Sequence, residues 1–311
     1  MICMLCGSQM TCYLKYVSSV FTRGEGKQYD LFQCEECELL VTHPLPTETL
    51  LSNLYSSAYS YDSHLAIRAE KKLRAKNLLN SVTNEALTSP KSLIDLGCGN
   101  GELVRLASAR GIRSLGVDLA APEDTVGEPV FVSSHIHEYL RRYEAGNFDL
   151  VVMSHSLEHL SDPQEILRNI RAKVLSQMGQ VILVVPNSQA WSARTFKKWW
   201  GYWQVPVHLH HFSLKSLSRM ALDTGFVVDK VKLRGADSLF WVLTAMNIFR
   251  MTPGSASVMK MKLLTLVSWV LRYWMFIGQE DLIVVLRPDS EKFGRFGNMD
   301  REIAVNETSS A

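Results

Sequence analysis

Beyond residue 90, short apolar runs alternate with amphipathic stretches along the chain. The apolar runs are "SLIDLG", "SLGVDL", "PVFVSS", "FDLVVMS" and "QVILVVPN", each short enough for a buried strand. Apolar residues recur at helical spacing in "GELVRLASARG", "DPQEILRNIRAKV" and "SLKSLSRMALDTGF". Buried strands separated by helices predict an α/β fold with a parallel, doubly wound sheet. Such sheets bind ligands at the carboxyl ends of their strands.

Residues that start and end helices support these predicted elements. We expect Asp162 to cap the N-terminus of one helix, with Pro163 in its first turn, and Ser213 to cap another. Gly111 and Gly225 follow two of the amphipathic stretches, and glycine commonly ends a helix. The predicted helices therefore have defined boundaries.

The N-terminal part carries two Cys-x-x-Cys pairs, Cys3 with Cys6 and Cys34 with Cys37. Two such pairs on tight turns supply four thiolates, the ligand set of a tetrahedral structural zinc ion. Redox-active or unligated cysteines are the alternative interpretation. The spacing favours zinc, and we expect residues 1–45 to form a small zinc ribbon.

The rest of the chain divides by composition and periodicity. Residues 46–90 are expected to form a linker and an N-terminal helix, the helix from about residue 63 to residue 82. Residues 91–290 carry the alternating strands and helices of the main domain. Residues 291–311 are polar, and we expect them to form a disordered tail.

Composition and charge limit the binding partners and the cellular compartment that we expect for this chain. The chain has 311 residues, is 47% hydrophobic and carries a net charge of +2, so no strong field favours nucleic acid over the whole surface. The N-terminus lacks the basic and apolar regions of a signal peptide. Six cysteines without an export signal indicate a reducing, cytoplasmic location, where Cys12, outside the pairs, is expected to be a buried thiol.

The loop "DLGCGNG", after the first predicted strand of the sheet, is the strongest candidate for a cofactor site. Gly97, Gly99 and Gly101 allow the backbone to turn tightly and approach a ligand, but their spacing departs from the nicotinamide fingerprint. Asp95 precedes the glycines and suits a cationic ligand such as S-adenosylmethionine. Asp118 ends the next strand, where a carboxylate can accept hydrogen bonds from both ribose hydroxyls.

Together these motifs resemble the class I S-adenosylmethionine-dependent methyltransferases. "LIDLGCGNGE" and "GVDL" are similar to the first two motifs of the family, "FDLVVMSHSLEHLSDP" to its fourth strand and the following loop, and "GQVILVVPN" to its fifth strand. "CELLVTHPLPTETLLSNLY" and "HLHHFSLKSLSRMALDTGF" resemble the branch with an N-terminal four-cysteine zinc ribbon. The resemblance implies a Rossmann-like seven-stranded sheet and places Ser154 and His155 beside the methionine end of the cofactor.

The stretch "HSLEH", residues 155–159, has three interpretations. As H-x-x-E-H it matches the zinc signature of inverted metalloproteases, but a strand has just ended there and the required helix does not fit. A metal held by Glu158 and His159, with help from His155 and "HLHH", would resemble the site of small-RNA 2′-O-methyltransferases. The interpretation that we favour is a loop that Glu158 and His159 organise by hydrogen bonds, without metal.

The acceptor is less well defined by the sequence than the cofactor. An oxygen or carbon acceptor needs a base, and the candidates are His155, His208, His210 and His211. "VPNS" after the fifth strand differs from the N-P-P-aromatic motif of enzymes that methylate planar nitrogen. We therefore expect a small-molecule, sugar or lipid-linked acceptor. The alternative is an RNA methyltransferase guided by the zinc ribbon.

Two further segments carry aromatic and basic residues. "WSARTFKKWWGYWQVP" either contacts the acceptor or packs as a cover loop. "FVVDKVKL" and "DLIVVLRP" are expected to be strands six and seven of the sheet. Between them, residues 238–278 read as two helices with wide apolar faces. These helices either bury their faces on each other, on the sheet or in a dimer, or contact a lipid-linked acceptor or the inner surface of a membrane.

Overall fold

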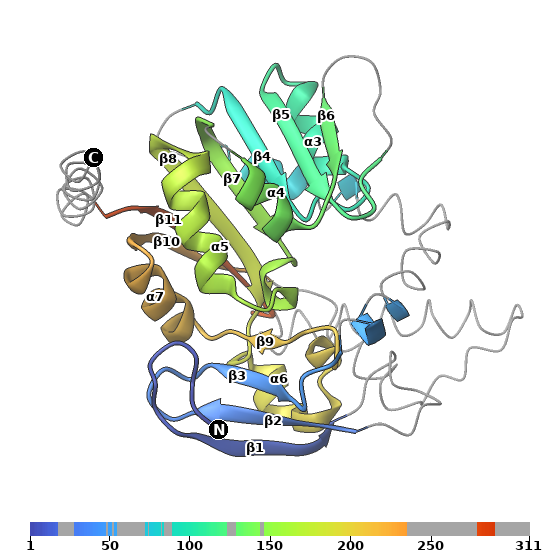
Figure 1. The fold of residues 1–311 in the computed structure, drawn as a ribbon, viewed down its shortest axis with the longest axis vertical. Helices are drawn as coiled ribbons and strands as arrows, with labels where there is room; N and C mark the ends of the chain where they lie inside the picture. Colours follow the sequence, from blue (N-terminus) through green and yellow to red (C-terminus); the bar gives the residue numbers. More distant parts are fainter. Residues whose placement is uncertain are drawn as a thin grey trace, which may run out of the picture.

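The computed structural model describes residues 1–17, 28–47, 49–51, 53–54, 72–73, 75–81, 83, 89–122, 129–143, 146–234 and 279–289. The described chain forms two β-sheets (Figure 1). The larger sheet contains β4 (Ser92–Leu96), β5 (Arg113–Asp118), β6 (Val130–Ser133), β7 (Phe148–Ser154), β8 (Leu175–Pro186), β10 (Phe226–Arg234) and β11 (Asp281–Pro288). The helices are α3 (Glu102–Ser108), α4 (Ile136–Arg142), α5 (Pro163–Asn169), α6 (Trp191–Phe196) and α7 (Leu214–Asp223).

The larger sheet has the strand order β10–β11–β8–β7–β4–β5–β6. The five neighbouring strands β8, β7, β4, β5 and β6 are parallel. Strand β11 runs antiparallel to both β8 and β10. The predicted doubly wound α/β fold is confirmed, and the expected strands six and seven are β10 and β11. The carboxyl ends of β4, β5 and β7 therefore meet at one edge of the sheet, as the sequence predicts.

Both faces of the larger sheet are covered, which explains why its strands are continuous apolar runs. Alternate residues of β8 point to opposite faces: Val181, Leu183 and Val185 belong to one buried cluster, Ile182 and Val184 to another. The first cluster includes α4, α5 and α7, and the second includes α3 and the described helical residues between 72 and 83.

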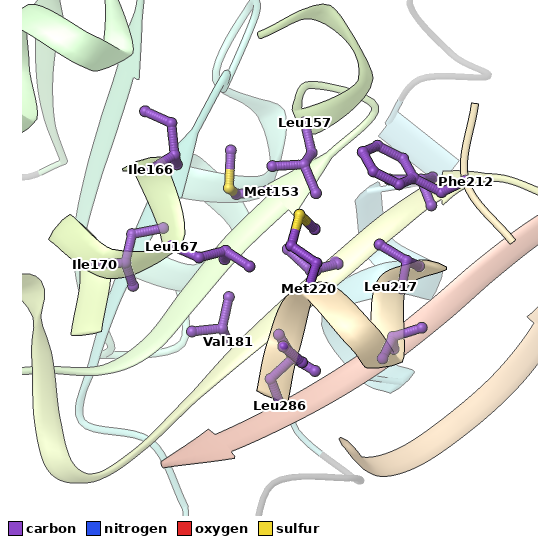
Figure 2. Close-up of a cluster of buried hydrophobic side chains, with 14 of the residues drawn as sticks. Met153, Leu157, Ile166, Leu167, Ile170, Val181, Phe212, Leu217, Met220 and Leu286 are labelled. Atoms are coloured by element: carbon purple, nitrogen blue, oxygen red, sulfur yellow. The ribbon is translucent and has the colours of Figure 1, made fainter. Parts of the chain in front are cut away.

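Helices α5 and α7 pack on one face of the sheet against β7, β8 and β11 (Figure 2). Asp162 caps α5 by accepting a hydrogen bond from the Glu165 amide at 2.9 Å, with Pro163 in the first turn. Ser213 caps α7 through a reciprocal capping box with Ser216. These predicted caps are confirmed. The packed side chains include Met153, Leu157, Ile166, Leu167, Ile170, Val181, Phe212, Leu217, Met220 and Leu286.

The smaller sheet joins the N-terminal part of the chain to the main domain. It contains β1 (Met10–Val17), β2 (Tyr29–Cys34), β3 (Leu40–His43) and, from the "HLHH" stretch, β9 (His210–His211), in the order β1–β2–β3–β9. β9 pairs antiparallel with β3. The Thr42 hydroxyl donates to the carbonyl oxygen of His208 at 2.7 Å. The two parts thus share a continuous sheet and buried hydrogen bonds.

The tryptophan-rich segment after β8 mainly packs against the smaller sheet. Trp200 and Trp203 are almost fully buried together with residues of β1, β2 and β3, which supports the packing interpretation for both. The indole Nε1 of Trp200 donates to the buried carboxylate of Glu280 at 2.9 Å. Of the four tryptophans in this segment, Trp191 and Trp199 are each 41% exposed and remain accessible to a ligand.

One expectation from the sequence is wrong, and two others concern residues outside the described chain. Cys12 is exposed on β1 rather than buried, because that strand lies at the edge of the smaller sheet and Cys12 points away from its core. The apolar segment 238–278 and the tail 291–311 lie outside the described residues. Among the described residues, no helix is both long and apolar enough to cross a bilayer.

Candidate functional site

A cavity of about 470 Å³ opens at the carboxyl ends of β4, β5 and β7. This volume lies within the range of about 300–1,000 Å³ that is common for sites that bind small molecules. Six of the seven residues predicted to bind the cofactor line the cavity, namely Asp95, Gly97, Gly99, Asp118, Ser154 and His155. The remaining one, Gly101, is the N-cap residue of α3 and does not line the cavity.

The glycine loop after β4 has a backbone that only glycine adopts easily. Gly97 has φ +90°, and a Cβ atom there would lie 2.5 Å from the Cβ of Ser156. Gly101 has φ +76°, and a Cβ atom there would overlap the ring of Phe131. Side chains at these positions would force the loop away from the neighbouring strands. The loop is thus held close to the sheet edge, with its amide groups beside the cavity.

Two acidic residues flank the glycine loop from neighbouring strands. Asp95 on β4 is 4% exposed, and its Oδ1 has no hydrogen-bond partner in the described part of the chain. Burial, together with the nearby charge of Asp118, raises the pKa of Asp95 to about 7. Asp118 accepts hydrogen bonds from the amides of Gly99 and Ala120, both at 2.9 Å. The cavity therefore offers negative charge that a cation could compensate.

His155 follows β7 and lies between two buried acids. Its Nδ1 is 3.5 Å from Oε1 of Glu158, and its Nε2 is 3.7 Å from Oδ2 of Asp281. Burial alone would lower the pKa of His155, but the two carboxylates raise it to about 9. The imidazole is then already protonated at neutral pH and cannot take up a further proton. His155 remains a candidate to contact the cofactor, but its environment disfavours the role of base.

The other three histidines predicted as bases lie away from the cavity lining. His208, His210 and His211 are each 3% exposed, and burial lowers their pKa values below that of an exposed histidine. His208 Nδ1 bonds to the carbonyl oxygen of Tyr202 at 2.9 Å, and His211 Nε2 bonds to the hydroxyl of Thr42 at 3.0 Å. His210 and His211 form β9, which pairs with β3, and both therefore have a structural role where the N-terminal part meets the main domain.

Some residues at the cavity were not among those predicted to bind the cofactor. His159 and Arg234 line it, and Arg234 forms an ion pair with Asp281 at 2.8 Å. Asp281 is the first residue of β11 and is 2% exposed. A signal was present in the sequence, because an acid directly before the apolar run "LIVVL" is unusual for a buried strand. Its partner Arg234 could not be foreseen, since it ends β10 on the far side of segment 238–278.

The four N-terminal cysteines converge, as the sequence predicts. Their Sγ atoms all lie within 4.8 Å of one another, with Cys3 and Cys37 at 3.5 Å and Cys6 and Cys34 at 3.3 Å. These separations exceed a disulfide bond of about 2.05 Å. They are close to the edge of about 3.8 Å that four thiolates form around zinc with bonds of about 2.3 Å. The cluster therefore fits a tetrahedral metal ion.

Comparison with known proteins decides the family. A family model described as "Methyltransferase domain" matches residues 66–231, which is more than half of the chain. The chain belongs to this methyltransferase family. The match covers the glycine loop, both acids of the cavity and the "HSLEH" loop.

Individual relatives of this methyltransferase domain are more distant. It is 31% identical over 98 residues to the ubiquinone biosynthesis O-methyltransferase of Chromobacterium violaceum, covering 29% of this chain and 42% of that protein. The protein with the same description from Idiomarina loihiensis is 30% identical over 117 residues, covering 35% and 45%. The chain thus spans less than half the length of these curated relatives.

A solved structure shares the fold of this methyltransferase. It is the 1,6-didemethyltoxoflavin-N1-methyltransferase of Burkholderia thailandensis, solved with 1,6-didemethyltoxoflavin and S-adenosylhomocysteine. The TM-score is 0.50 at 15% sequence identity, and the alignment covers 84% of this chain and 96% of the other. At this identity the likeness concerns the fold alone.

Proposed function

We propose that the protein transfers the methyl group of S-adenosylmethionine to an oxygen atom of a small-molecule acceptor. The observation that carries the cofactor assignment is the buried Asp95, whose Oδ1 has no hydrogen-bond partner among the described residues beside the cavity. S-adenosylmethionine bears an ammonium and a sulfonium group, and either charge would compensate this carboxylate. Asp118 is placed to accept hydrogen bonds from the ribose hydroxyls.

The reaction needs alignment more than chemical activation by the protein. The acceptor oxygen attacks the methyl carbon, the sulfur–methyl bond breaks as the oxygen–methyl bond forms, and the acceptor proton passes to solvent or to a nearby base. Because the sulfonium is already a good leaving group, the main contribution of the protein is to hold both reactants in line. The O-methyltransferase descriptions of the relatives support an oxygen acceptor.

Affinity for S-adenosylmethionine should fall as the pH decreases from about 7 to about 5.5, a window in which an α-amino group stays protonated. The pKa of Asp95 is raised to about 7, so its carboxyl becomes neutral across this window and loses its attraction for the cation. The expected loss approaches about tenfold per pH unit below the pKa. Isothermal titration calorimetry measures the affinity. Asp95→Asn should bind more weakly and lose this pH dependence; an unchanged pH dependence in that variant would contradict the assignment.

We also propose that Cys3, Cys6, Cys34 and Cys37 hold one structural zinc ion. Support comes from the Sγ separations and from the two turns, in which the carbonyl oxygens of Cys3 and Cys34 each accept a hydrogen bond at 2.9 Å from the amide four residues later. Burial raises the pKa values of the Cys3 and Cys37 thiols, so a cation is needed to stabilise their thiolates. Zinc supplies that charge and would tie the two turns together.

For the acceptor, we propose a lipid-linked or membrane-associated molecule that residues 238–278 help to bind. The described residues that flank this segment in the sequence are Arg234, which lines the cavity, and Gln279. Arg234 pairs with Asp281 on the neighbouring strand at 2.8 Å, so the described chain on both sides of the segment lies near the cavity. The segment's apolar sequence with basic and tryptophan residues suits an amphipathic surface.

The intact protein should partly sediment with anionic liposomes at low salt, because apolar burial and attraction between basic residues and lipid headgroups add together. Deleting residues 238–278 should abolish sedimentation while leaving calorimetric binding of S-adenosylmethionine unchanged. Trp191→Ala serves as a comparison, since this exposed tryptophan lies outside the deleted segment. A wild-type protein that stays entirely in the supernatant would contradict the membrane proposal.

A further inference from the structure

The carboxylate of Glu158 is buried without a hydrogen bond. Its side chain is 1% exposed, and neither Oε1 nor Oε2 has a hydrogen-bond partner in the part of the chain that the structure describes. Leaving a buried carboxylate in this state is costly. The sequence favoured a loop that Glu158 and His159 organise by hydrogen bonds. His159 forms such a bond with the carbonyl oxygen of Val207, whereas the side chain of Glu158 forms none within the described chain. A positive charge close to the carboxylate is the physical alternative.

Two histidines present ring nitrogens to the same carboxylate. One donor atom from each of Glu158, His159 and His208 lies within 4.8 Å of the others. His159 Nδ1 bonds to the carbonyl oxygen of Val207 at 2.8 Å, and His208 Nδ1 bonds to that of Tyr202 at 2.9 Å. A carbonyl oxygen only accepts, so each Nδ1 carries the hydrogen. Such backbone carbonyls commonly fix the ring orientation of metal-binding histidines through the second nitrogen.

The separation of the donor atoms suits a bridging cation better than a direct contact. His208 Nε2 lies 3.9 Å from Oε1 of Glu158, which is too long for a hydrogen bond. A metal ion about 2.0–2.2 Å from each atom would fill this gap. Two histidines and one glutamate are also a familiar set for metal sites that keep a position open for substrate.

We propose that Glu158, His159 and His208 bind one divalent transition-metal ion at the edge of the cofactor cavity. His159 belongs both to the cluster and to the cavity lining, so the proposed metal site adjoins the cavity. His155 Nδ1 lies 3.5 Å from the same Oε1 atom, and a positive charge on His155 is the alternative to a metal ion for balancing the charge of Glu158. The buried β9 junction explains why His208, remote in sequence, reaches Glu158: the Leu209 amide donates to the Glu158 carbonyl oxygen at 2.9 Å.

The inferred role of the metal rests on the proposed function and specifies its acceptor. A cation held by Glu158, His159 and His208 would make an acceptor hydroxyl beside it lose its proton more easily, because it would stabilise the resulting negative charge. The oxyanion attacks the sulfonium methyl, giving the methyl ether and S-adenosylhomocysteine, and the released proton passes to solvent. The acceptor class is then an alcohol or phenol that coordinates a metal, and none of the four predicted histidine bases is required.

Manganese provides a direct probe, because Mn²⁺ favours oxygen and nitrogen donors and is a poor partner for the N-terminal thiolates. Mn²⁺ is titrated into the full-length protein, and the unbound ion is followed by its electron paramagnetic resonance signal. Wild-type protein should bind one Mn²⁺ per chain. Glu158→Gln and His208→Gln should weaken binding roughly 100-fold or more, since they remove a direct ligand and not only an outer partner.

Controls separate metal binding from folding and from cofactor binding. His210→Gln changes a histidine as deeply buried as His208, at 3% exposure, and should keep wild-type manganese affinity. Glu158→Asp keeps a carboxylate and should lose less affinity than Glu158→Gln. Binding of S-adenosylmethionine is measured on every variant, so failure of the proposed function would be visible independently of manganese. Wild-type protein that binds no Mn²⁺, or Glu158→Gln protein that binds it equally well, would overturn the metal site.

Discussion

The double variant Cys34→Ser/Cys37→Ser should purify without zinc and with a disrupted smaller sheet. Structural zinc contributes about 10–16 kcal/mol of apparent binding free energy in zinc-finger peptides, so losing two of four ligands should leave the turns without their main restraint. Wild-type protein prepared without chelator should contain one zinc per chain by elemental analysis. Thermal unfolding should show an early loss of the smaller sheet in the variant.

Cys12→Ser is the matched control for this variant, because Cys12 is exposed and lies outside the four-cysteine cluster. It should retain full zinc content and wild-type thermal unfolding. Zinc-free wild-type protein, or full zinc content in the double variant, would contradict the ribbon proposal. The larger sheet carries Asp95 and Asp118, so the double variant should still bind S-adenosylmethionine.

The second large effect is expected at Asp118. Asp118→Ala should reduce affinity for S-adenosylmethionine by about 1.5–3 kcal/mol, since it removes a charged acceptor for two hydroxyls. The same change also removes the acceptor of the Gly99 and Ala120 amides, which should loosen the glycine loop. Calorimetry on wild-type and variant protein measures the difference.

Asp149→Ala is a suitable comparison for Asp118→Ala. Asp149 also accepts hydrogen bonds from backbone amides, those of Lys91 and Ser92 at 2.8 and 3.1 Å, but it lies at the start of β7, away from the cavity lining. It should lower thermal stability without changing cofactor affinity. Unchanged affinity in Asp118→Ala would show that the ribose contact is assigned wrongly.

Local sequence patterns were sufficient for most of the larger sheet. Apolar runs of strand length identified its strands, and the caps at Asp162 and Ser213 were correctly placed because capping depends on a few neighbouring residues. The glycine loop was also predictable, since a positive φ at Gly97 and Gly101 is a local requirement. Zinc-ligand spacing likewise indicated which cysteines converge.

Contacts between distant segments could not be derived in the same way. β9 is two residues long, too short for a periodic pattern, and its pairing with β3 depends on the whole fold. The "HLHH" stretch was therefore interpreted as a source of bases, whereas His210 and His211 lie buried at the junction. The raised pKa of His155 results from Asp281, which is distant in sequence, together with the neighbouring Glu158. His208 likewise lies 3.9 Å from Glu158 through a contact between segments that are distant in sequence.

The central claim is that the cavity at the ends of β4, β5 and β7 binds S-adenosylmethionine for methyl transfer. Calorimetric titration of the wild-type protein tests it most directly. We expect one binding site per chain for S-adenosylmethionine, competition by S-adenosylhomocysteine for the same site, and no competition by a nicotinamide dinucleotide. Absence of binding at neutral pH, or binding that the nicotinamide dinucleotide displaces, would contradict it.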